Sequence, residues 1–203
     1  MRIDVSKFHH MNIVDTCAVW HVLSSQRLYR SARAQKIEFF VTEYVLYECL
    51  LKPRSKPKSR REEKKLHADQ ELCGRLTKER NSGGFKTYHL DVDDLQNVTL
   101  LKERQRLGLG ELASIALALK IRQAFMTDDQ KARKLAESEM RTDLVQTTPH
   151  LFGWLIYEGL LSDSDKDVVI HEHNEMTGEL EPYLLEIYHE ALRCRLMMSP
   201  SLS

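Results

Sequence analysis

Short apolar segments alternate with longer helix-forming segments along most of this 203-residue chain. Most of the short segments are apolar runs, as expected for strands that are covered on both faces of a sheet. They are "NIVD" (12–15), "KIEFFVTEY" (36–44), "FKTYHLDV" (85–92), "QAFMT" (123–127) and "DLVQTT" (143–148). Strands separated by helices pair in parallel. The order therefore predicts an α/β fold, a three-layer α/β/α sandwich with a central parallel sheet of four to five strands.

The segments between these strands predict helices. They cover 16–25, 43–51, about 61–80, 93–108, 110–122, 128–139 and 149–161, and two more helices follow residue 163. Thr42 is a suitable N-cap for the helix at 43–51, and Pro53 and Pro57 end it. We expect one domain over 1–161, with a charged helical insert at about 52–84, and a C-terminal helical extension over 162–203.

Composition limits where such a chain functions. The formal net charge is zero, so no global field attracts nucleic acid. The four cysteines are widely spaced and form no CxxC pair, which favours reduced, structural thiols. No apolar run reaches 18 residues and the N-terminus has no continuous apolar segment. We therefore expect a soluble, cytoplasmic protein that does not bind membranes.

Acidic residues fall where the predicted fold binds ligands. Asp15 ends the first strand, Asp128 and Asp129 follow the "QAFMT" strand, and Glu48 and Glu111 lie on inward helix faces. The carboxyl ends of strands in open α/β sheets form the ligand cleft. Carboxylates gathered there repel one another unless a cation compensates. Oxygen ligands without a Cys/His cluster favour Mg²⁺ or Mn²⁺ over Zn²⁺.

The order of these acids resembles the PIN-domain family of metal-dependent ribonucleases. The resemblance rests on "IVDTCAV" (13–19), "VTEYVLYECL" (41–50), "LGELASIALAL" (109–119) and "FMTDDQKARKLA" (125–136), and it covers about residues 11–160. It implies that Asp15, Glu48, Glu111 and Asp128 hold one or two Mg²⁺ or Mn²⁺ ions and form the catalytic set with Asp129, an alternate fourth ligand. Thr16 and Thr127 would orient the acids, and Glu43 replaces Glu48 if the helix register differs.

The resemblance implies an endoribonuclease that hydrolyses phosphodiester bonds of RNA. Small PIN proteins are commonly toxins, so an antitoxin protein and further copies of the same chain are expected partners beside RNA. Two alternatives stay open: a PIN-like RNA-binding or scaffold module with an impaired site, and a structure-specific DNA nuclease. The length of the 52–84 segment and the tail after Asp163 depart from a compact family member.

Charge is unevenly distributed along the chain. Residues 52–65 contain eight Lys/Arg and two Glu, and 162–190 contain nine Asp/Glu and one Lys. The basic segment is either a solvated loop or a phosphate-binding surface. As nucleic-acid-binding candidates we name Lys52, Arg54, Lys56, Lys58, Arg60 and Arg61. The spacing of His171 and His173 does not indicate zinc binding.

Overall fold

A five-stranded sheet forms the centre of the molecule, in a computed structural model that describes residues 4–53, 56–91, 93–94 and 106–198. All its strand pairs are parallel and the strand order is β3-β2-β1-β4-β5. The strands are β1 (Met11–Val14), β2 (Glu38–Thr42), β3 (Phe85–Tyr88), β4 (Ala124–Met126) and β5 (Val145–Gln146). The predicted parallel α/β architecture is confirmed.

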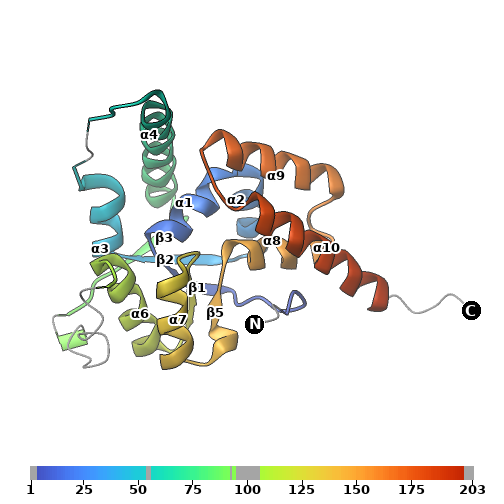
Figure 1. Ribbon diagram of the computed structural model, residues 1–203. Coiled ribbons are helices and arrows are strands. Elements are labelled where there is room, and N and C mark those ends of the chain that lie inside the picture. Colours follow the sequence, from blue (N-terminus) through green and yellow to red (C-terminus); the bar gives the residue numbers. More distant parts are fainter. Residues whose placement is uncertain (1–3, 54–55, 92, 95–105, 199–203) are drawn as a thin grey trace, which may run out of the picture.

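Helices cover both faces of the sheet (Figure 1). On one face lie α1 (Thr16–Ser24), α2 (Gln26–Ala34), α4 (Arg60–Asn81) and α8 (Thr148–Tyr157), and on the other lie α6 (Leu109–Ile121) and α7 (Gln130–Glu139). Neighbouring residues of one strand pack against opposite helical layers, because successive side chains of a strand point to opposite faces of the sheet. Val14 packs in the core beneath α1 and α8, whereas Ile13 packs against α6.

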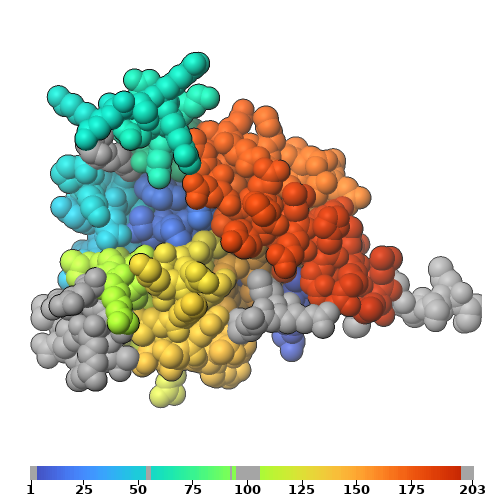
Figure 2. Space-filling view, in the orientation of Figure 1, coloured from blue at the N-terminus to red at the C-terminus, as the bar shows by residue number. Residues whose placement is uncertain are grey.

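The C-terminal segment forms two helices that belong to the same core. They are α9 (Asp163–Glu175) and α10 (Glu181–Met198), and α10 lies along α8 (Figure 1). In the space-filling view of Figure 2, these two helices form the orange to red part of the surface. Leu184 and Ala191 of α10 are buried in the core that α1 and α8 share. Gly153 of α8 permits the close approach, since a Cβ there would lie 2.6 Å from Ile187 Cγ1. Removal of these helices would therefore expose apolar core.

Several element boundaries differ from the sequence prediction. The predicted helix over 43–51 is α3 (Glu43–Leu46) followed by a π-helical turn, η1 (Tyr47–Leu51), which the amide of Lys52 closes by donating to Tyr47 O at 2.8 Å. The helix α2 was not predicted. The strand predicted at 143–148 is reduced to β5, after the 3₁₀ turn η3 (Thr142–Leu144). Most of the helix predicted at 93–108 lies outside the described residues.

The charged segment before β3 contributes a packed helix. The C-terminal half of α4 lies against α1, with Leu72 and Leu76 buried. Arg75 also donates to the carbonyl oxygens of Leu23 and Ser24 at 2.9 and 3.0 Å. The helix α4 thus forms much of the crossover between β2 and β3. Among the described residues, no helix combines the length and the apolar character needed to cross a bilayer.

Candidate metal centre

Asp15 lies at the carboxyl end of β1, where the chain turns into α1. It is the N-cap of α1, and its Oδ1 accepts a hydrogen bond from Ala18 N at 2.9 Å. Thr127 Oγ1 donates to Oδ2. The side chain is fully buried. Burial raises the pKa of Asp15 to about 7, although the hydrogen bonds from Thr127 and Ala18 oppose the shift. The charge of Asp128 raises it further.

Asp128 follows β4, the strand beside β1. Its Oδ1 accepts from Thr148 N at 2.9 Å, and its Oδ2 accepts from Thr148 Oγ1 at 2.6 Å. Oδ2 also lies 2.8 Å from His21 Nδ1. The chain moves outward in opposite directions from β1 and β4, so Asp15 and Asp128 flank the point where the strand order reverses. Ligands of open α/β sheets bind at that point.

The carboxylates of Glu48 and Glu111 both lie beside Gly108, at the start of α6, and that of Glu48 also lies beside Gly110. Glu48 accepts hydrogen bonds from Thr16 Oγ1 at 2.6 Å and from Gly110 N at 3.2 Å. Gly108 N donates to Glu111 Oε2 at 2.7 Å. A Cβ at Gly108 would lie 3.4 Å from Glu48 Oε1 and 3.6 Å from Glu111 Oε2. Burial raises the pKa of Glu111, with smaller contributions from the charges of Asp129 and Glu48.

The two alternate acids have different surroundings. Asp129 is the N-cap of α7, and its Oδ1 accepts from Lys131 N at 2.7 Å and Ala132 N at 2.9 Å. Glu43 is exposed and lies 2.6 Å from His89 Nδ1. Glu48, in contrast, is hydrogen-bonded to Thr16 of α1. The helix register thus directs Glu48 toward the carboxyl end of β1.

The structure brings the predicted acids together as two neighbouring groups. The charge of Asp128 raises the pKa of Asp15, and the charges of Asp129 and Glu48 raise the pKa of Glu111. Among the described residues, no three of the predicted acids have donor atoms within 4.8 Å of one another, whereas Cys17, His21 and Asp128 do. These three side chains form a group that could hold a metal ion.

The sequence does not single out Cys17 and His21 as site residues. The wide spacing of the four cysteines indicates structural thiols, and in the structure these four cysteines form no disulfide. The signal that points to the site is a different spacing. Cys17 and His21 are four residues apart in α1, which places them on the same helix face. Only the position of Asp128 after β4 completes the group.

The described part of the basic segment is exposed. Its described nucleic-acid-binding candidates are Lys52, Lys56, Lys58, Arg60 and Arg61, whereas Arg54 lies outside the described residues. Glu179 lies in the connection between α9 and α10, and its Oε1 is 3.9 Å from Arg61 Nη2. Both side chains are highly exposed. The basic segment and the acidic extension therefore meet at this pair.

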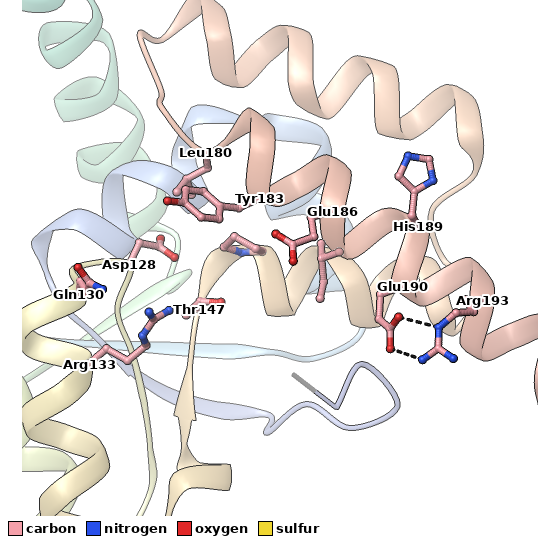
Figure 3. A pocket seen from close by; sticks show the side chains of 12 residues that line it. Asp128, Gln130, Arg133, Thr147, Leu180, Tyr183, Glu186, His189, Glu190 and Arg193 are labelled. Carbon is pink, nitrogen blue, oxygen red and sulfur yellow. Dashed lines mark hydrogen bonds and ion pairs between the residues drawn. The ribbon is translucent and has the colours of Figure 1, made fainter. Parts of the chain in front are cut away.

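A cavity of about 690 Å³ opens beside Asp128 (Figure 3). Gln130, Arg133 and Thr147 lie on the side of the α/β domain, and side chains of α10 line the other side. From α10, Tyr183 is 58% exposed and extends toward the end occupied by Asp128. Arg193 is held by Glu190, with Nη2 2.6 Å from Oε1. The C-terminal extension thus forms one wall of a cleft at the candidate site.

Comparisons with known proteins give no relative for this chain. No family model matches it, and neither a curated protein nor a solved structure does.

Proposed function

We propose that this chain is a metal-dependent endoribonuclease of the PIN type, which hydrolyses phosphodiester bonds of RNA. The observation that supports it most is the placement of Asp15 and Asp128 just after two adjacent strands, at the reversal of strand order. Glu111 lies in the first turn of α6, and the carboxylate of Glu48, from η1, reaches the same turn, where Gly110 N donates to it. Thr16 links Glu48 to α1, the helix that Asp15 caps.

The acids fit a divalent cation of the Mg²⁺ or Mn²⁺ class. Asp15 is completely buried, and its pKa of about 7 reflects the cost of an uncompensated charge there. A nearby cation would favour the ionised form. The donors of Asp15, Glu48, Glu111 and Asp128 are all carboxylate oxygens, which hard cations prefer. Such an ion would supply a lowered pKa for its bound water and charge neutralisation at the phosphate.

The chain's own residues would hold and orient the acids. Thr127 fixes Asp15, Thr148 fixes Asp128, and Thr16 fixes Glu48, each through a hydroxyl hydrogen bond. These hydroxyls limit rotation of the carboxylates, so that the geometry is set before substrate arrives. Preorganised charge of this kind favours catalysis because it need not reorganise during reaction.

RNA would occupy the cleft between α10 and the domain. Tyr183 offers an exposed aromatic ring for base stacking, and Arg133 offers a cation for a phosphate. The basic segment at Lys52–Arg61 would extend the interface to phosphates farther along the strand. An antitoxin protein and self-association remain predictions; a neighbouring gene encoding a small DNA-binding protein would support the toxin context.

A second candidate is a PIN-like RNA-binding module with an impaired site. It is favoured by the contacts of Asp128, whose Oδ2 already meets Thr148 and His21. The separation of the acids also favours it. In the described part of the chain, no three of the predicted acids have donor atoms within 4.8 Å of one another, as a shared metal ion would require. The DNA-nuclease alternative gains no comparable support, because α4 packs on α1 as a crossover helix.

Cleavage and binding assays on the same RNA distinguish the two candidates. The purified chain is expected to cleave RNA in the presence of Mg²⁺ or Mn²⁺, and cleavage should stop when EDTA is added. The Asp15→Asn variant should turn over at least about 100-fold more slowly than the wild type. Asp167→Asn serves as a control, since Asp167 is exposed on α9. Binding without cleavage in any metal would support the second candidate and contradict the first.

A further inference from the structure

Cys17, His21 and Asp128 offer sulfur, nitrogen and oxygen donors at one place. One donor atom from each residue lies within 4.8 Å of the other two. We propose that these three side chains form a binding site for a transition-metal dication, with Zn²⁺ the best match. This site differs in donor chemistry from the carboxylate set, although it shares Asp128. The site itself does not depend on nuclease activity.

The backbone holds the three donors in place. Cys17 and His21 are one helical turn apart on α1. Asp128 comes to them from the end of β4, because β4 pairs with β1. His21 Nδ1 lies 2.8 Å from Asp128 Oδ2, and Asp128 N donates to Cys17 Sγ at 3.3 Å. The helix α1 and the end of β4, which are distant in sequence, therefore already hold the three donor atoms close together.

The donor set selects the class of metal. Three protein ligands plus one open position are typical of non-structural zinc sites. Tetrahedral bonds of about 2.0–2.3 Å place ligand atoms about 3.3–3.8 Å apart. Metal binding would therefore lengthen the 2.8 Å contact between His21 Nδ1 and Asp128 Oδ2 and would need donor shifts of about 1 Å or less, since all donors already lie within 4.8 Å of one another. Mg²⁺ binds sulfur poorly, whereas Zn²⁺ and Co²⁺ accept thiolate and imidazole. The Cys17 thiol would release its proton to solvent as the sulfur–metal bond forms.

A fourth ligand is close at hand. Asp15 Oδ1 lies 3.4 Å from Cys17 Sγ, so it borders the same space. His173 is unsuitable, since Leu180 N donates to its Nε2 and Ser24 Oγ contacts its Nδ1. Water or Asp15 would therefore complete the coordination.

The metal-free chain titrated with Co²⁺ tests the site directly. Thiolate coordination gives a near-ultraviolet charge-transfer band, and tetrahedral Co²⁺ gives intense visible bands. We expect both, with one Co²⁺ bound per chain, and we expect Zn²⁺ to abolish them by displacement. Cys17→Ser should remove the charge-transfer band, and His21→Ala should lower the Zn²⁺ affinity by at least about 10-fold.

Cys73→Ser is the matched control, because the Cys73 thiol of α4 donates to Cys49 O and is not one of the three grouped donors. It should retain the full Co²⁺ spectrum. A charge-transfer band that survives in Cys17→Ser, or that vanishes in Cys73→Ser, would overturn the assignment. So would the absence of any band in the wild-type chain. Circular dichroism identifies an unfolded variant, in which case the effect of His21→Ala on Zn²⁺ affinity decides.

One consequence rests on the proposed nuclease function. Because Asp128 belongs to both sets, bound Zn²⁺ would withdraw it from the carboxylate cluster and inhibit Mg²⁺-dependent cleavage. Cys17→Ser should then tolerate at least about 10-fold more Zn²⁺ before cleavage falls. An intact Co²⁺ spectrum without Zn²⁺ inhibition would leave the site standing and contradict the role of Asp128 in cleavage.

Discussion

A Cβ atom at Gly110 would lie only 2.5 Å from Glu48 Oε2. The backbone amide of Gly110 also donates to Glu48 Oε1 at 3.2 Å. The absence of a side chain therefore lets the first turn of α6 hold the carboxylate directly. The Gly-Glu start of this helix combines an amide donor for Glu48 with the adjacent carboxylate of Glu111.

Gly110→Ala is expected to displace the Glu48 carboxylate and to reduce RNA cleavage by at least about 10-fold, as a misplaced catalytic group does. Steady-state cleavage at saturating Mg²⁺ measures the effect. Gly74→Ala is the control, because a Cβ at that α4 position meets nothing within 4 Å. The control should stabilise the fold by about 0.5–1 kcal/mol and keep its activity. Equal activity of both variants would remove Glu48 from the site.

The central fold was predictable because its signals are local. The apolar run at 39–41 forms a strand, and Thr42 caps α3 by accepting from Val45 N at 3.3 Å. The helix α2 was missed because Gln26–Ala34 is largely polar and only Ser25 separates it from α1. The available sequence signal was Ser25, a residue type favoured at helix N-caps, whose Oγ accepts from Leu28 N in the structure.

The candidate site was less predictable, because it depends on contacts between distant elements. The sequence predicted Asp15 and Asp128 at the ends of two strands, and the strand order shows that these strands are neighbours. The hydrogen bond between His21 and Asp128, however, joins residues 107 positions apart. The cavity wall formed by α10 likewise depends on docking against α8, which the acidic composition of the extension did not indicate.

Asp15→Asn is expected to stabilise the metal-free fold at pH 8 and to have little benefit at pH 4. The raised pKa of Asp15, about 7, means that the folded state holds its proton more tightly than the unfolded chain. Its stabilising contribution is complete below the unfolded pKa near 3.8 and is lost as pH rises through about 7. The full loss corresponds to about 4 kcal/mol. Urea unfolding in EDTA across this pH range measures the difference.

Asp167→Asn controls for the general effect of removing a carboxylate, and its stability should follow the wild type with pH. Added Mg²⁺ should stabilise the wild-type chain at pH 8 more than it stabilises Asp15→Asn. If the free energy of unfolding of the wild type and of Asp15→Asn changed with pH in the same way, the claim that Asp15 carries an uncompensated buried charge would be wrong.

His173 is expected to make the fold sensitive to acid. Leu180 N donates to Nε2, so the proton of the neutral ring lies on Nδ1 and is donated to Ser24 Oγ. Burial lowers the pKa of His173 to about 4, and His21 contributes to the shift. The stability from the neutral ring is complete above pH 6.5 and is lost as pH falls through about 4. The loss amounts to about 3 kcal/mol.

His173→Gln removes this titration, so its free energy of unfolding should fall less between pH 6.5 and 4 than that of the wild type. His171→Gln is the matched control, since the His171 side chain is 74% exposed. Chemical denaturation at several pH values measures the slopes. A wild-type slope in His173→Gln would assign the acid sensitivity to other groups.

Tyr183→Ala is expected to weaken binding of short single-stranded RNA by about 5- to 150-fold, because base stacking contributes about 1–3 kcal/mol per base. Fluorescence anisotropy in EDTA measures binding without cleavage. Tyr183→Phe keeps the ring and should bind nearly as the wild type does. If Phe and Ala weaken binding equally, the hydroxyl rather than the ring makes the contact.

Neutralising the basic segment tests whether it guides RNA to the acids. The slope of log affinity against log salt should become shallower by about 0.7 for each phosphate of a single strand that the protein no longer neutralises. Binding should weaken for all RNA sequences alike, because phosphates carry no sequence information. The variant replaces by Gln the described nucleic-acid-binding candidates of the segment: Lys52, Lys56, Lys58, Arg60 and Arg61.

The exposed cations Arg30 and Lys36 of the α2 region provide a control pair for this variant. Their replacement by Gln should leave the salt slope unchanged, because they lie outside the basic segment. Since Arg61 contacts Glu179, Glu179→Gln should strengthen RNA binding if that acid competes with phosphate. An unchanged salt slope in the basic-segment variant would identify the segment as a solvated loop.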